Sequence, residues 1–252
     1  MAKLLGQVAV GSIVKLKENG SLVDFYVAKH DYESGLNGAG RTLVVRKDCY
    51  IEREWHNYNT NNYVNSTIKS WLNSDYKNIL DANILELIGT TKYYSTPGGG
   101  NNGVTVLTDA VFLLSMTELG ISKNWYNVEG SVLPIVDTLK ITYMTGSPIN
   151  YWTRSPVTQR TDQSGLLTST GDENRDYCSY SMGARPVFTL SSTAVVLDDL
   201  TVSALPTSPT LTVPSQAMQG QSIPINWTAS ANADSYQLQR NTGSGWSTIY
   251  QL

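Results

Sequence analysis

Several residue types are scarce in this chain of 252 residues, which has two cysteines, two histidines and three phenylalanines. Two cysteines cannot provide a disulfide framework. Cys49 and Cys178 could pair if the fold brings them together, but buried, reduced thiols are the favoured expectation. A chain of this length can instead bury a sizeable hydrophobic core. No apolar run approaches the roughly 18 residues of a membrane-spanning helix, which predicts no membrane insertion. The first eleven residues are too short and too interrupted by glycine for a signal peptide, which predicts folding in a cytoplasm.

An excess of positive charge is also missing. Lysine and arginine together number 18 against 21 acidic residues, for a net charge of −3. The basic residues are scattered and form no stripe that could follow a phosphate backbone, so a nucleic-acid partner is not expected. What is abundant is tyrosine and tryptophan, with 15 and six residues. Both combine an apolar body with a polar group, which favours a β-rich recognition protein.

Two segments, residues 151–156 and 183–190, each run from apolar residues into an arginine and a proline. Proline fixes its own φ and removes a hydrogen-bond donor, so both segments are predicted to be strands with pinned ends. Each arginine brings five fixed donors that can bind loop carbonyls or a carboxylate. We therefore predict structural roles for Arg154 and Arg185, and a core position for Trp152.

Composition changes near residue 200, where the proline-rich stretch 205–210 begins a different pattern. The predicted organisation is a domain over 1–200, a linker over 201–209 and a second module over 210–252. Within the first domain, alternating residues predict a hairpin of strands 12–17 and 22–28 around the turn at Asn19 and Gly20. Further strands are expected at 41–46 and 111–114.

Helical spacing is clearest over residues 66–76, where Asn65 or Ser66 can cap the helix and Trp71 lies on the apolar face. A second helix is predicted over 81–88, ending at Gly89. Residues 115–120 resemble a single capped helical turn. The first domain is therefore predicted to be an α+β fold of small antiparallel sheets with two or three short helices and long loops.

The tail has a different pattern, with strands expected at 211–213, 222–227 and 235–240. With Trp227 after an alternating strand, it resembles the first half of a fibronectin type III module, which is a β-sandwich. Either the natural chain continues past Leu252, or another chain completes the sandwich.

Motifs for catalysis are weak. Ser66 and Lys69 have the Ser-x-x-Lys spacing of penicillin-recognising enzymes, but the companion motifs are missing and a helix cap explains Ser66. His30 and His56 lack the companions that a zinc site or a Cys-His pair requires. The glycine-rich stretch 98–103 lacks the lysine of a phosphate-binding loop and is expected to be a surface loop. The sequence therefore predicts no enzyme and no cofactor.

Acidic residues gather at 172–176, with Asp172 and Asp176 as the best metal candidates. Their spacing fits no EF-hand loop, so a solvated acidic turn is favoured and no metal site is predicted. Polar aromatic loops are the candidates for ligand contact, because aromatic faces and amides suit sugar rings or protein side chains. For the first of them, 56–63, a simple polar turn before the helix is the favoured alternative. The candidate residues are Tyr58, Asn61, Tyr63, Trp125, Tyr126, Asn174 and Tyr177.

Taken in order, six segments resemble a known family. They are 10–16 (VGSIVKL), 46–48 (RKD), 63–73 ending in WLN, 111–115 (VFLLS) with Glu118, 152–156 (WTRSP) and 184–188 (ARPVF). The chain is similar over roughly residues 5–195 to an uncharacterised domain family of Gram-positive bacterial surface proteins and their phages. That resemblance implies a C-type-lectin-like fold. The sequence departs from the related formylglycine-generating enzyme, whose paired copper-binding cysteines are absent, and from calcium-dependent sugar-binding lectins, whose Glu-Pro-Asn and Trp-Asn-Asp motifs are absent.

The resemblance implies a non-enzymatic structural and binding protein of a tailed phage virion, in a tail fibre, baseplate or capsid decoration. Its expected partners are other virion proteins, further copies of itself, and a host-surface glycan or protein. Such a protein would be assembled in the host cytoplasm and released by lysis. Two alternatives stay open: a bacterial cell-surface adhesin, and an oxidising enzyme of the formylglycine-generating type.

Overall fold

The computed structural model describes residues 2–205, 208–214, 222–230, 233, 235–241 and 243–251. The chain divides into two compact units, Met1–Ser203 and Ala204–Leu252. We call them unit 1 and unit 2 and describe each by itself. Strand β17 (Val202–Ser203) belongs to unit 1, although a linker was expected from residue 201. Pro206 and Thr207 of that expected linker lie outside the described residues.

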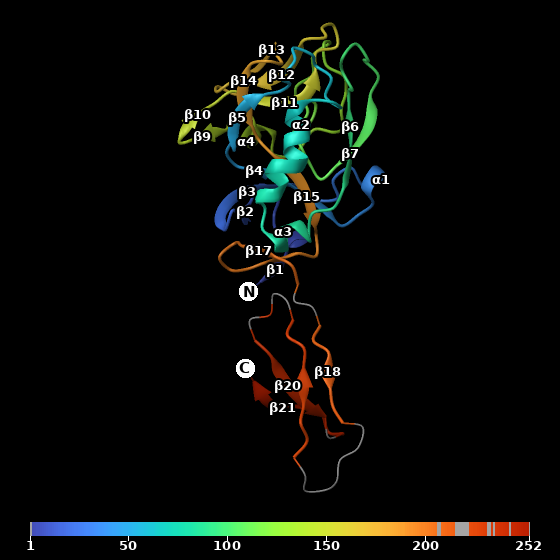
Figure 1. Ribbon diagram of the computed structural model, residues 1–252, viewed down its shortest axis with the longest axis vertical. Coiled ribbons are helices and arrows are strands. Elements are labelled where there is room, and N and C mark those ends of the chain that lie inside the picture. Colours follow the sequence, from blue (N-terminus) through green and yellow to red (C-terminus); the bar gives the residue numbers. More distant parts are fainter. Residues whose placement is uncertain are drawn as a thin grey trace. The chain divides into compact units, whose positions relative to one another are not determined.

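The first large sheet of unit 1 is antiparallel and has the strand order β2-β3-β4-β15-β8 (Figure 1). Its strands are β2 (Ile13–Glu18), β3 (Ser21–Lys29), β4 (Arg41–Arg46), β15 (Val187–Ser191) and β8 (Val111–Phe112). Asn19 and Gly20 both have positive φ, as the tight turn between β2 and β3 requires. Phe25 and Phe188 meet in the core with ring centroids 5.4 Å apart. The predicted hairpin and the strand 41–46 are confirmed.

The second large sheet is mixed and has the order β13-β12-β11-β14-β5. Its strands are β5 (Ile51–Glu54), β11 (Tyr151–Pro156), β12 (Gln163–Leu167), β13 (Glu173–Tyr177) and β14 (Ser181–Ala184). Every residue of β11 is buried, and Tyr151 pairs in parallel with Gly183 of β14. The 183–190 segment serves both sheets, because β14 ends at Ala184 and β15 begins at Val187. Arg185 and Pro186 form the crossing between them.

Short elements complete unit 1. The remaining strands are β1 (Lys3–Leu4), β6 (Thr91–Ser95), β7 (Thr105–Asp109), β9 (Tyr143–Met144), β10 (Ser147–Pro148), β16 (Val195–Val196) and β17. The helical segments are η1 (Leu5–Gln7), α1 (Ser34–Asn37), α2 (Thr67–Trp71), η2 (Leu72–Tyr76), η3 (Lys77–Ile79), α3 (Ala82–Leu85) and α4 (Val136–Leu139). Among the described residues, no helix is long and apolar enough to cross a membrane.

The predicted helix at 66–76 is present as three consecutive helical segments, α2, η2 and η3. Ser66 is its cap, since the Ser66 Oγ accepts a hydrogen bond from the Lys69 N–H at 3.2 Å. The middle segment is a π turn, where the Asn73 amide bonds both to the Lys69 carbonyl and to the backbone of Val111. Trp71 packs on Tyr50, which lies outside the helix, with ring centroids 5.9 Å apart, so it holds the helix to the domain.

The predicted α+β, C-type-lectin-like fold class is wrong. Among the described residues 39% lie in strands and 12% in helices, so the fold is β-rich, built of small antiparallel and mixed sheets. The predicted helix at 81–88 shows why. It ends at Leu85, because Ile88 forms a β-bridge with Leu190 and the Leu87 carbonyl accepts from the Ser191 N–H. Tertiary pairing here outweighs local helix propensity.

Over its described residues, unit 2 contains two separate two-stranded sheets. They are β18 (Leu211–Thr212) with β19 (Asn226–Trp227), and β20 (Gln237–Asn241) with β21 (Trp246–Gln251). The predicted fibronectin type III sandwich is therefore not established, because over the described residues each of these sheets has only two strands. Asp234, which directly precedes the predicted third strand, lies outside the described residues.

Candidate functional site

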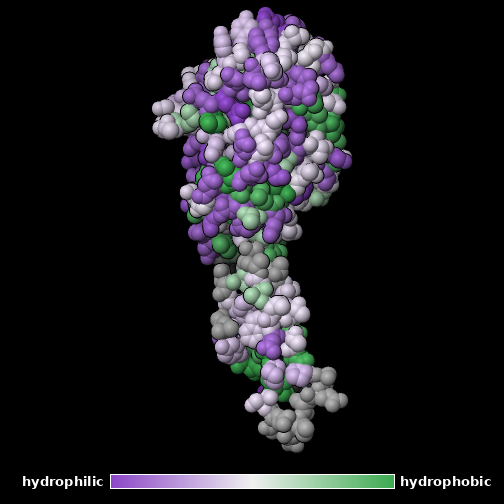
Figure 2. Space-filling model, viewed as in Figure 1, coloured by the Kyte–Doolittle hydropathy of each residue, from purple (hydrophilic) through white to green (hydrophobic). Residues whose placement is uncertain are grey.

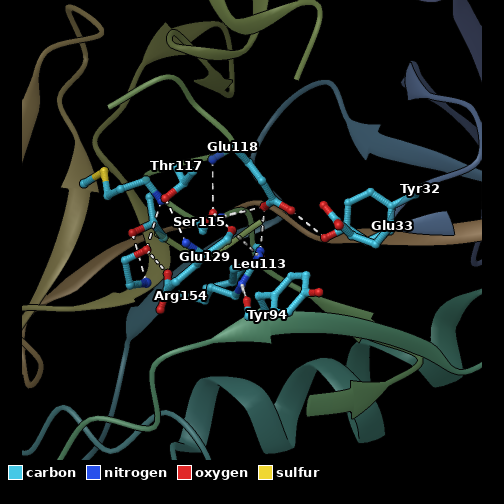
Figure 3. A network of polar contacts seen from close by, with 12 residues as sticks. Tyr32, Glu33, Tyr94, Leu113, Ser115, Thr117, Glu118, Glu129 and Arg154 are labelled. Carbon is cyan, nitrogen blue, oxygen red and sulfur yellow. Dashed lines mark hydrogen bonds and ion pairs between the residues drawn. The ribbon is translucent and has the colours of Figure 1, made fainter. Parts of the chain in front are cut away.

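A buried cluster of ionisable groups in unit 1 surrounds Arg154 on β11 (Figure 3). Its side chain is fully buried. The guanidinium donates to the carbonyls of Leu113 at 2.7 Å and Tyr94 at 3.1 Å, and to the Glu118 carboxylate at 2.6 Å. Burial alone lowers the pKa of Arg154, but the charge and hydrogen bond of Glu118, together with the nearby Tyr32 and Glu129, outweigh burial and raise that pKa overall. The guanidinium therefore remains charged in the core.

Glu118 is held by the predicted capped turn. The Ser115 N–H donates to its carboxylate at 2.8 Å, and the Glu118 N–H donates to the Ser115 hydroxyl at 3.1 Å, which is a reciprocal capping box. Tyr32 donates to the other carboxylate oxygen at 2.5 Å. Burial, and then the Glu118 charge, raise the pKa of Tyr32 well above its usual value, so the phenol stays a neutral donor. The Glu118 oxygens are thus satisfied from three directions.

A second carboxyl group, that of Glu129, lies in the same buried cluster. It accepts hydrogen bonds from the Thr96 N–H at 2.5 Å and from the Ser155 hydroxyl. Burial raises the pKa of Glu129, and the charge of Arg154 offsets this only in part. Two carboxyl groups thus share one arginine, and the one without a direct ion pair is held toward its neutral form.

This raised pKa predicts a pH-dependent stability. Above the ordinary pKa of glutamate, about 4.3, the unfolded chain ionises at Glu129 more readily than the folded one. The free energy of unfolding of the wild type should therefore fall as pH rises through the folded pKa of Glu129. Glu129→Gln has no ionisable group at this position and lacks this pH dependence. We expect the stability of Glu129→Gln relative to wild type to increase between pH 4 and 7, measured by urea denaturation. A constant difference over this range would contradict the assignment.

The buried cluster cannot reach a ligand. Arg154, Glu118 and Glu129 are all 0% exposed. Arg185 is likewise buried and donates to the carbonyls of Arg46 at 2.8 Å and Leu139 at 2.6 Å. Both arginines thus use their donors to hold loops on the sheets, and the candidate site must lie elsewhere.

An exposed row of side chains lies along β13, the edge strand of the second sheet. Glu173, Arg175 and Tyr177 alternate along the strand and so point to one face. Gly165 of β12 pairs with Arg175, and a Cβ there would come within 2.6 Å of Met116 and 2.9 Å of Tyr126. The missing side chain at position 165 therefore allows the loop that carries Tyr126 to pack against this face.

At one end of the row, two cations lie near the Trp125 ring. The Arg175 guanidinium is 4.6 Å from the centre of its ring and the Lys123 ammonium 5.9 Å. The Trp125 Nε1–H donates to a Glu173 carboxylate oxygen at 3.1 Å, and the Tyr126 hydroxyl donates to the same oxygen at 2.9 Å. One carboxylate thus fixes both aromatic side chains.

At the other end, the Arg160 guanidinium lies 6.0 Å from the centre of the Tyr177 ring and pairs with Asp162 at 2.8 Å. Tyr180, which is 51% exposed, meets Tyr177 edge-on with ring centroids 5.7 Å apart. We define the β13 strip as Trp125, Arg160, Glu173, Arg175 and Tyr177, all of them partly or fully exposed. Its aromatic faces, guanidinium groups and carboxylate are the groups that bind hydroxyl-rich or anionic ligands.

The residues predicted from the sequence to bind a ligand do not lie together in the structure. Trp125 and Tyr177 lie in the β13 strip, and Tyr126 supports it from a nearly buried position, 7% exposed. Asn174 is on β13 but points to the opposite face, because it alternates with the strip residues. Tyr58 is 70% exposed and belongs to another loop.

Two of these binding predictions, Asn61 and Tyr63, are wrong, since both side chains are fully buried. The Asn61 amide nitrogen lies within hydrogen-bond distance of the carbonyls of Val157, Arg160 and Gln163, at 2.9–3.1 Å. Its amide oxygen accepts from the Gly99 N–H at 2.8 Å. Asn61 therefore joins three loops and holds in place the one that carries Arg160.

Three residues of this region were missed by sequence reasoning, namely Arg160, Glu173 and Arg175. The alternating pattern of residues 173–177 could have indicated a strand with Glu173, Arg175 and Tyr177 on one face. Nothing in the local sequence indicates that Trp125, 48 residues away, packs over that face.

The residues considered for metal binding and the two cysteines do not form a metal-binding or reactive site among the described residues. The Asp176 carboxylate accepts from the Tyr177 N–H and that of Asp172 from the Thr170 hydroxyl. Among the residues that the structure describes, no group of three metal-binding side chains occurs. Cys49 and Cys178 are free and buried, as predicted, and burial raises the pKa of Cys49 to about 11. Such thiols are poor nucleophiles.

Comparison with known proteins gave one match. The model of a family described as a domain of unknown function (DUF6273) matches residues 39–192, which include the whole β13 strip and both buried arginines. No curated protein and no solved structure matches the chain.

Proposed function

The chain belongs to this family of unknown function, and we propose that it is a non-enzymatic recognition protein whose β13 strip binds a glycan on the surface of a bacterial host. The observation that carries the proposal is the packing at Trp125. Its ring lies beside the Arg175 guanidinium, and its N–H is fixed by Glu173. Aromatic side chains fixed in this way bind sugar rings at little cost in conformational entropy.

The strip offers two kinds of contact to a saccharide. The partly exposed rings of Trp125 and Tyr177 suit the apolar faces of pyranose rings, while Arg160 and Arg175 suit hydroxyl, carboxylate or phosphate groups. These side chains stand on a β-sheet and on a loop held by Asn61, so they are presented on a rigid base. A preformed surface of this kind favours binding over chemistry that requires an enclosed pocket.

The buried position of the reactive groups supports a non-enzymatic role. Glu118, Glu129 and Arg154 are all enclosed by the core. The alternative of a formylglycine-generating type of oxidase requires reactive thiols, and Cys49 and Cys178 are both buried with raised pKa values. No observation on the described residues favours this alternative.

We place this recognition role in the virion of a tailed phage, in a tail fibre, baseplate or capsid decoration. The support is the sequence resemblance to a family found in phages and in Gram-positive surface proteins. Mass spectrometry of purified particles tests the location, and absence of the chain from them would contradict it. Recovery from a bacterial cell wall instead would identify an adhesin that uses the same strip.

Binding is tested with wild type, Trp125→Ala and Tyr177→Ala on an array of bacterial wall polysaccharides, followed by calorimetry on any ligand found. We expect each variant to weaken binding at least about tenfold, which corresponds to ~1.4 kcal/mol of lost stacking. Tyr143→Ala is the matched control, because Tyr143 is 43% exposed but lies on β9. Equal losses in all three variants, or no binding by wild type, would refute a glycan site at the strip.

A further inference from the structure

The hairpin β6–β7 is a two-stranded sheet at the rim of unit 1 (Figure 1). One edge of it is closed by the side chain of Asn37 at the end of α1. The Asn37 amide oxygen accepts from the Lys92 N–H at 2.8 Å, and the amide nitrogen donates to the Lys92 carbonyl at 2.9 Å. The backbone of Lys92 therefore points away from β7 and is satisfied by this amide.

This geometry fixes which backbone groups of β7 point outward. Along each strand of an antiparallel pair, residues whose backbone N–H and C=O groups point to the partner strand alternate with residues whose groups point away from it. Two residues that lie opposite each other either both point toward the partner strand or both point away. Lys92 pairs with Thr108, and Tyr94, whose carbonyl accepts from Arg154, pairs with Val106. Val106 and Thr108 therefore direct their N–H and C=O groups away from β6, to the free edge. Among the described residues, no backbone or side-chain group meets them there.

Two other strand edges in unit 1, those of β8 and β13, are closed by side chains. The Asn73 amide binds both the N–H and the C=O of Val111 on β8. On β13, the outward N–H of Arg175 donates to the Asn174 side chain and that of Tyr177 to the Asp176 side chain, each at 2.8 Å. Capped edges of this kind resist pairing with another chain. The edge of β7 lacks such a cap.

The side chains along the β7 edge suit pairing. Val104 and Val106 are 43% and 40% exposed, and Val128 nearby is 74% exposed. Val104 and Val128 line a hollow beside the hairpin, together with Glu33, Tyr94, Gly130 and Ser131. An apolar patch is visible in this region in Figure 2. Residues 103–108 carry no charge, and the charge of Asp109 is paired with Lys69 at 2.8 Å. The edge has none of the lysine or proline residues that discourage association.

We propose that β7 pairs with β7 of a second copy of this chain, antiparallel across a two-fold axis centred on Val106. Val106 then lies opposite Val106 of the second copy, and Val104 lies opposite Thr108. These are the outward-facing positions, so three residue pairs exchange about six hydrogen bonds. A two-fold axis places identical residues together, and only an uncharged edge allows this without repulsion.

The size of this contact predicts a weak dimer. A five-residue edge with Val104, Val106 and Val128 buries less than the roughly 800 Å² per partner of standard stable complexes. The two copies should therefore associate reversibly. Because the β13 strip lies in a different sheet, the pairing would also supply two strips at once and so raise avidity for a repetitive polymer.

Sedimentation velocity of the full chain, up to roughly 200 μM, tests the pairing, since weak interfaces require such concentrations. We expect a concentration-dependent dimer for wild type and a monomer for Val106→Lys, which brings two ammonium groups together at the axis. Thr105→Lys is the matched control. It introduces the same charge one residue away, on the other face and at a position that pairs with Ser95, and should leave the dimer intact.

The register is tested by cross-linking under mild oxidation, in which Cys49 and Cys178 do not take part because they are buried. Val106→Cys should form a disulfide-linked dimer, since opposite residues have Cα atoms about 5.5 Å apart. Thr108→Cys alone should not, whereas combining it with Val104→Cys should. A wild type that stays monomeric at every concentration would overturn the proposal. So would a dimer insensitive to Val106→Lys, or equal cross-linking at 106 and 108. Circular dichroism melting confirms that each variant is folded.

Discussion

Replacing Glu118 with glutamine should lower the free energy of unfolding by about 3–5 kcal/mol, the range for leaving one member of a buried ion pair without its partner. Arg154 would keep its charge in the core, where its remaining acceptors are carbonyls such as that of Leu113 at 2.7 Å. The variant would also weaken the acceptor for the Tyr32 hydroxyl. Urea denaturation followed by tryptophan fluorescence measures the loss.

Two further variants show that the loss comes from the unpaired charge. Asp162→Asn breaks the exposed pair with Arg160 and should change stability little, since surface pairs are screened by solvent. Replacing both members of the buried pair, Glu118→Leu with Arg154→Met, should recover much of the loss, because no charge is then left in the core. If Glu118→Gln were as stable as Asp162→Asn, the buried ion pair would not stabilise the core as expected.

Gly98→Ala should cost about 3 kcal/mol or more, although it adds a single methyl group. Gly98 has a φ of +76°, which strains any other residue. A Cβ at this position would lie 1.8 Å from the backbone carbonyl oxygen of Asn61, so the loop 57–63 would have to move. Because Asn61 also holds the loop that carries Arg160, the displacement should extend to the β13 strip.

Gly100→Ala separates the two causes. Gly100 also has a positive φ, +90°, but the nearest atom to an added Cβ is 3.9 Å away. We expect this control to cost about 1 kcal/mol, from backbone strain alone. Thermal unfolding measures both variants, and limited proteolysis within 57–63 should be faster in Gly98→Ala. Equal stability of the two variants would show that the close approach to Asn61 is relieved without cost.

The sequence predicted those elements that are fixed by interactions between neighbouring residues, such as turns and helix caps. The turn residues Asn19 and Gly20 were sufficient to predict the first hairpin, because few other residues adopt positive φ readily. The Ser66 cap was predicted from its position before an apolar helical pattern. Arg154 and Arg185 were expected to bind carbonyls or a carboxylate, and their contacts agree, since a fixed set of donors next to a buried strand has few other uses.

Long-range pairing decided the rest. The segment after Ala82 has helical spacing, yet Ile88 pairs with Leu190, and the sum of such pairings turns an expected α+β domain into a β-rich one. Tyr63 has the same local signal as the exposed Tyr58, but it is buried against Trp55, with ring centroids 5.5 Å apart. Burial depends on what the rest of the chain places over a residue, and local composition does not contain that information.

What the sequence determined by itself is an aromatic-rich chain with two buried arginine segments, several well-signalled turns and no strong catalytic motif. The tertiary structure decided where recognition can occur. Trp125 and Arg175 come from segments 50 residues apart. They meet because Gly165, opposite Arg175 on β12, leaves room for the Tyr126 ring that follows Trp125 in the chain. The open edge of β7 is likewise a property of the packing, because it depends on Asn37 closing one side of the hairpin and nothing among the described residues closing the other.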